Sequence, residues 1–214
     1  MTDRADVLGA LGTVYDPELD EPITSLRFVA ACEVADSGAV DVRLRLPTPQ
    51  CAPNFAFLMA ADASRALWGV AGVTSVDVVL EDHYTGSEIN ATVNAGGSFS
   101  DAFPGETRGE LDALRALFQR KALLARQSGL LSEVPRRLGD LHGPEADRCR
   151  ELRRALGIDA SDDAAPFVTG DGVPVEATDV RFRRMASMTA LSLETNGGMC
   201  RDLLRVRYGE EMAA

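Results

Sequence analysis

The residue best placed for chemistry in this sequence is Cys51, which follows a proline-rich turn and precedes a predicted helix. A thiolate is the reactive and metal-binding form of cysteine, and the free N–H groups of a helix N-terminus favour that anion. Thr48 lies three residues earlier and could donate its hydroxyl to the thiolate or to a bound ligand. Alternatively, Cys51 is a small apolar residue at a buried corner, and the spacing alone leaves both interpretations open.

Other side chains are weaker candidates. His83 and Glu88 follow a predicted strand and carry ligands that borderline or hard metals accept, although solvated acids are common at such places. Cys200 follows a glycine pair and is predicted to open a helix, although a structural role is the simpler interpretation. Cys32 and Cys149 lie on apolar stripes and are predicted to be core residues.

The composition argues against several classes of protein. A net charge of -11 is unsuited to nucleic-acid binding, which needs a basic face. The chain has no apolar run long enough to span a membrane and no signal peptide at its start, so we expect a cytoplasmic protein. Four scattered cysteines and two histidines do not form a zinc motif or a complete cluster site within one chain.

The elements that must position Cys51 lie in the first 95 residues. Apolar periodicity and turn residues predict a small α/β domain with a mixed sheet over residues 1–95. We expect the two strands before Cys51 to form an antiparallel hairpin with one buried face. The predicted order is helix, strand, strand, helix, strand, over residues 4–15, 25–34, 40–46, 52–69 and 73–80.

The second half of the chain is predicted to be all-helical, which makes the whole an α+β fold. Residues 95–105 are rich in glycine and proline and are predicted to be a linker. The extension over residues 105–214 is expected to dock a partner or to dimerise. Its predicted helices cover residues 106–127, 130–138, a segment starting at Pro144, 179–194 and 199–208, the last two separated by Asn196-Gly197-Gly198.

Four short motifs, in this order, resemble the MIP18 family, also called DUF59. This family includes iron–sulfur cluster assembly factors and the phenylacetate-oxygenase accessory protein PaaD. The resemblance covers about residues 4–81, and its order agrees with the predicted elements. The motifs are Asp16-Pro17-Glu18-Leu19, Ser25-Leu26-Arg27-Phe28-Val29, Thr48-Pro49-Gln50-Cys51 and Val70-Ala71-Gly72-Val73.

The resemblance implies a role in maturing metalloproteins, and not an enzyme that turns over a small molecule. By this resemblance Cys51 would hold iron, a cluster or sulfur transiently, with Thr48 in support and Asp16 and Glu18 in a nearby acidic loop. A [2Fe–2S] cluster normally needs four thiolates, so Cys51 would share ligands across a homodimer or with a client metalloenzyme. Such iron or such a labile cluster can be lost on isolation.

The chain also departs from the family pattern. Arg27 stands where the pattern has glycine, and Ala52 stands where it has proline, with Pro53 one place later. Residues 103–106 and 120–127 are similar to longer members associated with bacterial di-iron monooxygenases, such as propane monooxygenase. This similarity implies an oxygenase component as the client.

Two other functions remain open at this point. The first is a metal-free adaptor or chaperone for a multicomponent oxygenase, which docks through the helical half. The second is a thiol enzyme with Cys51 as its nucleophile. No motif connects His83 or His142 to Cys51, and the thiol enzyme therefore lacks an evident base.

Overall fold

The computed structural model describes residues 2–106 and 111–209. The chain forms two compact units: unit 1 contains residues 1–111 and 197–214, and unit 2 contains residues 112–196. The predicted division placed all of 105–214 in one region, whereas the structure returns the chain to unit 1 from Gly197 onward. The physical reason is Leu204, which is 3% exposed within the core of unit 1.

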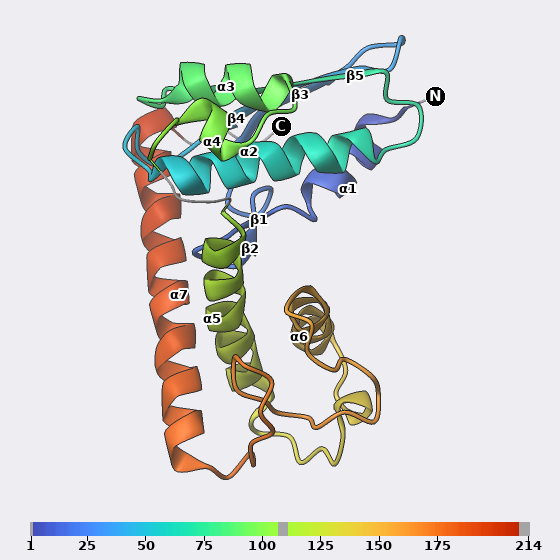
Figure 1. Ribbon diagram of the computed structural model, residues 1–214, viewed down its shortest axis with the longest axis vertical. Helices are drawn as coiled ribbons and strands as arrows, with labels where there is room; N and C mark the ends of the chain where they lie inside the picture. The colour runs from blue at the N-terminus through green and yellow to red at the C-terminus, as the bar shows by residue number, and fades with distance from the viewer. Residues whose placement is uncertain (1, 107–110, 210–214) are drawn as a thin grey trace. The chain divides into compact units, whose positions relative to one another are not determined.

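Unit 1 is built on a three-stranded mixed sheet, which confirms the predicted fold class (Figure 1). Strands β3 (Val29–Val34) and β4 (Ala39–Arg45) are antiparallel, and β5 (Ser75–Glu81) runs parallel to β4. The parallel pair requires a long crossover, which helix α2 (Pro53–Trp68) supplies. Helix α1 (Arg4–Leu11) precedes the sheet, together with a short pair of strands, β1 (Tyr15–Asp16) and β2 (Glu21–Pro22).

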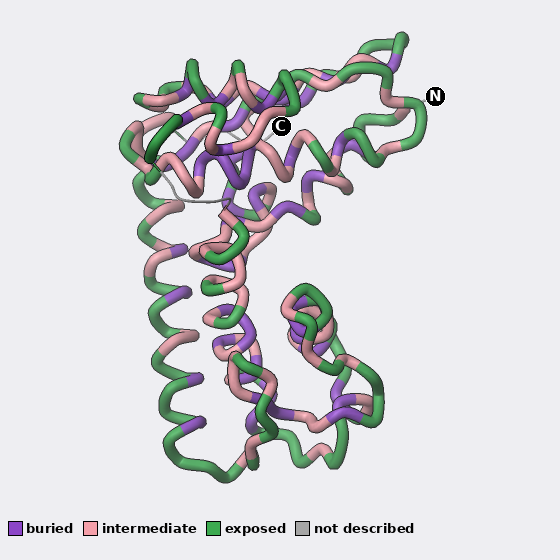
Figure 2. The backbone as a smooth tube through the Cα atoms, viewed as in Figure 1, coloured by how far each residue is buried: buried purple, intermediate pink, exposed green. Residues whose placement is uncertain are grey.

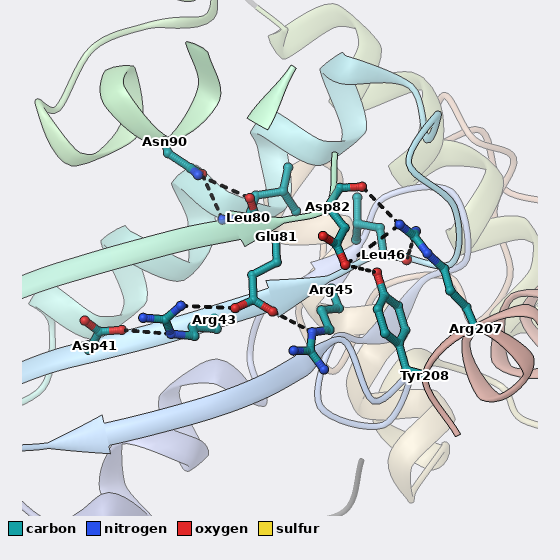
Figure 3. Close-up of polar contacts among 10 residues, drawn as sticks. All are labelled: Asp41, Arg43, Arg45, Leu46, Leu80, Glu81, Asp82, Asn90, Arg207 and Tyr208. Carbon is teal, nitrogen blue, oxygen red and sulfur yellow. Dashed lines mark hydrogen bonds and ion pairs between the residues drawn. The ribbon is translucent and has the colours of Figure 1, made fainter. Parts of the chain in front are cut away.

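The two faces of the sheet differ as the sequence alternation predicts. Val40, Val42 and Leu44 of β4 are buried in the core of unit 1. The intervening residues carry charge on the opposite face, where Arg43 donates to Glu81 at 3.1 Å and Arg45 also pairs with Glu81 (Figure 3). One face therefore packs against the helices and the other bears ion pairs.

The segment predicted as a linker is structured, and the prediction was wrong there. Helix α4 (Phe99–Ala102) begins with a capping box between Ser98 and Asp101. Phe99 and Phe103 are both buried, and the Phe99 ring meets the ring of Phe57 edge to face. Because these aromatic side chains complete the core, residues 99–103 belong to the folded unit.

A further helix that the sequence did not predict, α3 (Gly86–Asn94), covers the free edge of β5. The Asn94 side chain accepts from the Val78 N–H and donates to the Val78 carbonyl. Asn90, one helical turn earlier, bonds Leu80 in the same way. Two asparagines thus replace a neighbouring strand and protect an edge that could otherwise pair with another chain.

Replacing Asn90 by alanine is expected to lower the free energy of unfolding by about 1–3 kcal/mol, since both backbone groups of Leu80 lose their partner. Urea unfolding measures the change. Ser87→Ala, an exposed position on the same helix, is the control and should change stability by less than about 0.5 kcal/mol. An equal effect of the two variants would contradict the edge-covering role.

Unit 2 is helical. It contains α5 (Asp112–Leu130), the 3-10 helix η1 (Leu138–Asp140), α6 (Pro144–Ala155) and the first part of α7 (Val180–Tyr208). Apolar residues from these elements form its core, and buried positions recur along one side of α7 (Figure 2). No helix in the described ranges 2–106 and 111–209 is both long and apolar enough to cross a membrane.

Two predicted boundaries in the helical half were wrong. Residues 131–137 form turns and not a helix, because α5 continues through Gly129 to Leu130 and the short helix η1 begins only at Leu138. Gly197 and Gly198 do not split the last helix, because a glycine costs only about 1 kcal/mol inside a helix and packing can offset it. At Gly197 a side chain would lie 2.7 Å from the carboxylate of Glu21, so glycine permits a close approach there.

Candidate functional site

Cys51 lies in the loop between β4 and α2, just before the helix begins. Ala52 is the N-cap and Pro53 the first helical residue, so the predicted position at a helix start is confirmed. The Thr48 hydroxyl lies 3.5 Å from the Cys51 sulfur, and the Cys51 N–H donates to the Thr48 carbonyl at 3.4 Å. Cys51 is half-buried, and its thiol forms no disulfide with a described residue.

The turn after β5 holds this loop in place. His83 Nε2–H donates to the Cys51 carbonyl oxygen at 2.7 Å, and the Tyr84 N–H donates to the Pro49 carbonyl at 3.1 Å. His83 Nδ1 accepts from the Thr85 N–H at 3.3 Å, so both ring nitrogens are engaged. Burial lowers the pKa of His83, which favours the neutral ring. His83 therefore fixes the backbone at Cys51 and is not arranged as a metal ligand or as a base for the thiol.

The last turns of α7 pack against the ends of β4 and β5. Arg207 donates to the Leu46 carbonyl at 3.5 Å and to the Asp82 carbonyl at 3.3 Å, and the Tyr208 hydroxyl donates to Asp82 at 3.1 Å (Figure 3). Asp82 has a φ of 53°, and it immediately precedes His83. Contacts thus run from α7 through the turn after β5 to the Cys51 loop.

The same part of α7 brings a second thiol to this region. Cys200 lies next to Arg201, which forms an ion pair with Glu21. Glu21 belongs to the acidic loop, residues 16–22. Burial raises the pKa of the Cys200 thiol to about 11, and the nearby side chains of Asp16, Cys51 and Glu18 add to the rise. At neutral pH Cys200 is accordingly a neutral thiol within electrostatic reach of these three side chains.

The acidic loop is fixed by the carboxyl group of Asp16. Asp16 accepts from the backbone N–H groups of Glu18 and Leu19 at 2.8 and 2.9 Å. The side chain is almost fully buried, and this burial raises its pKa to about 6. Asp16 shapes the loop that carries Glu18, which is half-exposed.

The predicted site residues therefore separate into two sets. Thr48 and Cys51 lie together in one loop, and Asp16, Glu18 and Cys51 all lie close enough to Cys200 to raise the pKa of its thiol. Glu88 lies apart from them, exposed in the first turn of α3, with no hydrogen bond or ion pair to any described residue.

Sequence reasoning missed the contributions of Arg207 and Tyr208 to the site. Both act through contacts with Asp82, more than a hundred residues away, and no local pattern indicates such a contact. Cys32 and Cys149 are buried, as predicted for core residues.

The donor atoms near Cys51 suit iron only in part. Thiolate and carboxylate groups are ligands for iron and its clusters. Within the described part of the chain, however, no group of three or more His, Cys, Asp or Glu side chains is arranged to hold a metal ion. A metal ion at Cys51 would therefore need further ligands from outside the described residues.

Comparisons with known proteins match the same part of the chain. Residues 4–78 match the family described as iron–sulfur cluster assembly protein. The uncharacterized protein MJ1129 of Methanocaldococcus jannaschii is 36% identical over 90 residues, which cover 42% of this chain and 93% of that relative. No solved structure gives a significant match. The family match includes Asp16, Glu18, Thr48 and Cys51, and it ends before α7 and Cys200.

Proposed function

Because this chain belongs to the iron–sulfur cluster assembly protein family through its N-terminal domain, we propose that it is an accessory factor for a client enzyme. In this role it helps to assemble or mature an iron–sulfur or iron centre and does not turn over a small molecule. Cys51 is the ligand that receives the cargo, which is iron, a cluster or sulfur.

The observation that carries this proposal is the setting of the Cys51 thiol. Backbone hydrogen bonds to His83 and Tyr84 fix the loop, and the sulfur stays half-exposed. A thiol held in this way can bind cargo without rearrangement of its own loop. The described residues provide too few ligands to hold a cluster alone, so cargo must share its ligands with a second copy of the chain or with the client. Shared ligation of this kind suits transfer of the cargo better than storage.

Cys200 supports the same role from the C-terminal helix. The raised pKa of the Cys200 thiol keeps it protonated at neutral pH until cargo binds. Since metals bind thiolates, cargo would displace the Cys200 proton on binding. We propose Cys200 as a second thiol for the cargo, with Asp16 and Glu18 supplying negative charge beside it.

The test is anaerobic reconstitution of the full chain with iron and sulfide, followed by iron analysis and absorbance. Cys51→Ala is expected to lower bound iron at least about tenfold, since the half-exposed thiol ligand is lost. Cys200→Ala should retain part of the iron and lose it faster to a chelator.

Cys149→Ala is the matched control, because it removes one thiol from unit 2 and should bind as much iron as the wild-type chain. Equal iron in the wild-type chain and in Cys51→Ala would remove Cys51 from the role.

A second candidate function is a metal-free adaptor for a multicomponent oxygenase. Its support is the set of exposed apolar side chains on the unit 2 part of α7, Met185, Met188 and Leu191. An exposed apolar face of this kind is typical of a docking surface. If a purified oxygenase client reaches full activity with Cys51→Ala and loses it with Met188→Asp, the adaptor role replaces the ligand role.

A further inference from the structure

A cavity of about 450 Å³ lies within unit 1, and none of the residues proposed to receive cargo lines it. Residues 25–27 line one side of it, and the last turns of α7 from Gly198 onward line the other, together with Gly209 just beyond the helix. Three arginines face this space, Arg27, Arg201 and Arg205, against one carboxylate, Asp202. The lining is therefore basic in a chain whose net charge is -11.

Arg27 occupies a backbone position that favours glycine. Its φ is 60°, in the left-handed region that residues with a Cβ rarely adopt, and its side chain is exposed. No described residue forms a hydrogen bond or ion pair with its guanidinium group. A strained backbone with an unpartnered charge beside a cavity suggests that the side chain has a function there.

The other two arginines, Arg201 and Arg205, form ion pairs but keep N–H donors that a ligand in the cavity can use. Arg201 forms an ion pair with Glu21. This pair uses only some of the five N–H donors of the Arg201 guanidinium group. Arg205 pairs with Asp202 at 2.9 Å, and both side chains are more than half exposed, so this pair is weak and Arg205 can turn toward a ligand. The cavity thus offers several guanidinium N–H groups from two separate segments.

We propose that this cavity binds a small molecule that carries a carboxylate or phosphate group. The planar guanidinium fork matches both oxyanions with paired, charge-assisted hydrogen bonds. The volume lies within the range of small-ligand sites, about 300–1,000 Å³. The proposal is independent of iron binding at Cys51, because the two sites share no residue.

Isothermal titration of the full chain at low salt, with inorganic phosphate and with citrate as probes, tests this site. At least one probe should bind saturably with one ion per chain, and added sodium chloride should weaken the binding. Arg27→Gly should weaken it about tenfold, since one charge-assisted contact is lost. The same variant should keep or raise the melting temperature, because glycine suits the backbone at this position. Arg205→Gln should weaken binding similarly.

Arg65→Gln is the control, because Arg65 is an exposed arginine on α2 and does not line the cavity. Binding of phosphate alone would assign a phosphate-bearing ligand, and binding of citrate alone would assign a carboxylate ligand. Failure of both probes to bind, or binding that neither Arg27→Gly nor Arg205→Gln weakens, would overturn the proposal.

Discussion

Replacing Arg153 by alanine is expected to destabilise unit 2 by about 3–5 kcal/mol, one of the largest effects that a single substitution can have in this chain. Arg153 lies on α6 and is completely buried. Its guanidinium group donates to the carbonyl oxygens of Ala165 at 2.8 Å, Pro166 at 2.7 Å and Asp159 at 3.4 Å. Alanine leaves these three carbonyls without their donor, and each unmade bond costs about 1–3 kcal/mol.

Among the residues that the structure describes, the Arg153 guanidinium group is held by backbone carbonyl groups and forms no ion pair with a carboxylate. Burial lowers the pKa of this arginine, and its Nε–H meets no acceptor among the described residues. The side chain therefore contributes mainly by fixing the segment 159–166 against α6. Lysine cannot reproduce that geometry, because its single ammonium group cannot reach divergent carbonyls as a planar fork does.

Urea unfolding followed by circular dichroism, with amide hydrogen exchange across unit 2, measures the effect of Arg153→Ala. Arg154→Ala changes the neighbouring exposed arginine and should alter the free energy of unfolding by less than about 0.5 kcal/mol. Arg153→Lys should lie between the two. A loss of less than about 1 kcal/mol in Arg153→Ala would show that the segment 159–166 is held by its own packing.

The elements of unit 1 that follow local rules were predictable from the sequence. Alternation along β4 identifies Val42 and Leu44 as core residues, because successive side chains of a strand point to opposite faces. The stretch before Cys51 predicts a helix start, since two prolines end the strand and Pro53 suits the first helical turn. These patterns depend on neighbours within a few residues.

The return of α7 to unit 1 depends on contacts between distant residues and had no local sign. Gly197 and Gly198 indicate a break, yet Leu204 is buried in a core formed mainly by residues 7–103. Arg153 is another example, because an arginine in an amphipathic helix is expected at the surface, whereas this one is buried. In both cases tertiary packing determined the outcome and local propensity did not.

The candidate site shows the same division. Thr48 and Cys51 are three residues apart, so their proximity follows from the turn between them. His83 carries a side chain that suggests metal binding or base catalysis, yet it donates to a carbonyl oxygen of the Cys51 loop. Sequence alone gives the type of a side chain, whereas its role depends on which atom it meets.

The ionisation of Asp16 is expected to make the protein less stable as the pH rises from about 4 to 7. Burial raises the pKa of this carboxyl group from 3.8 to about 6, so the folded state binds a proton more tightly than the unfolded state does. Between these two values the folded state holds more protons, and stability must fall with rising pH. Above about pH 7 the free energy of unfolding is therefore lower by about 3 kcal/mol than if Asp16 kept its ordinary pKa, because each pKa unit corresponds to about 1.4 kcal/mol.

Asp16→Asn should remove this dependence, because the amide does not titrate and its oxygen can still accept from the Glu18 and Leu19 N–H groups. Unfolding in urea at about pH 5 and about pH 7.5 should show the wild-type chain losing about 1–2 kcal/mol more than the variant. Asp36→Asn, at an exposed turn, should behave like the wild-type chain. If wild type and Asp16→Asn lose the same stability, the Asp16 carboxylate is already ionised at pH 5 in the folded state. The acidic loop beside Cys200 would then carry the charge of the Asp16 carboxylate at both pH values.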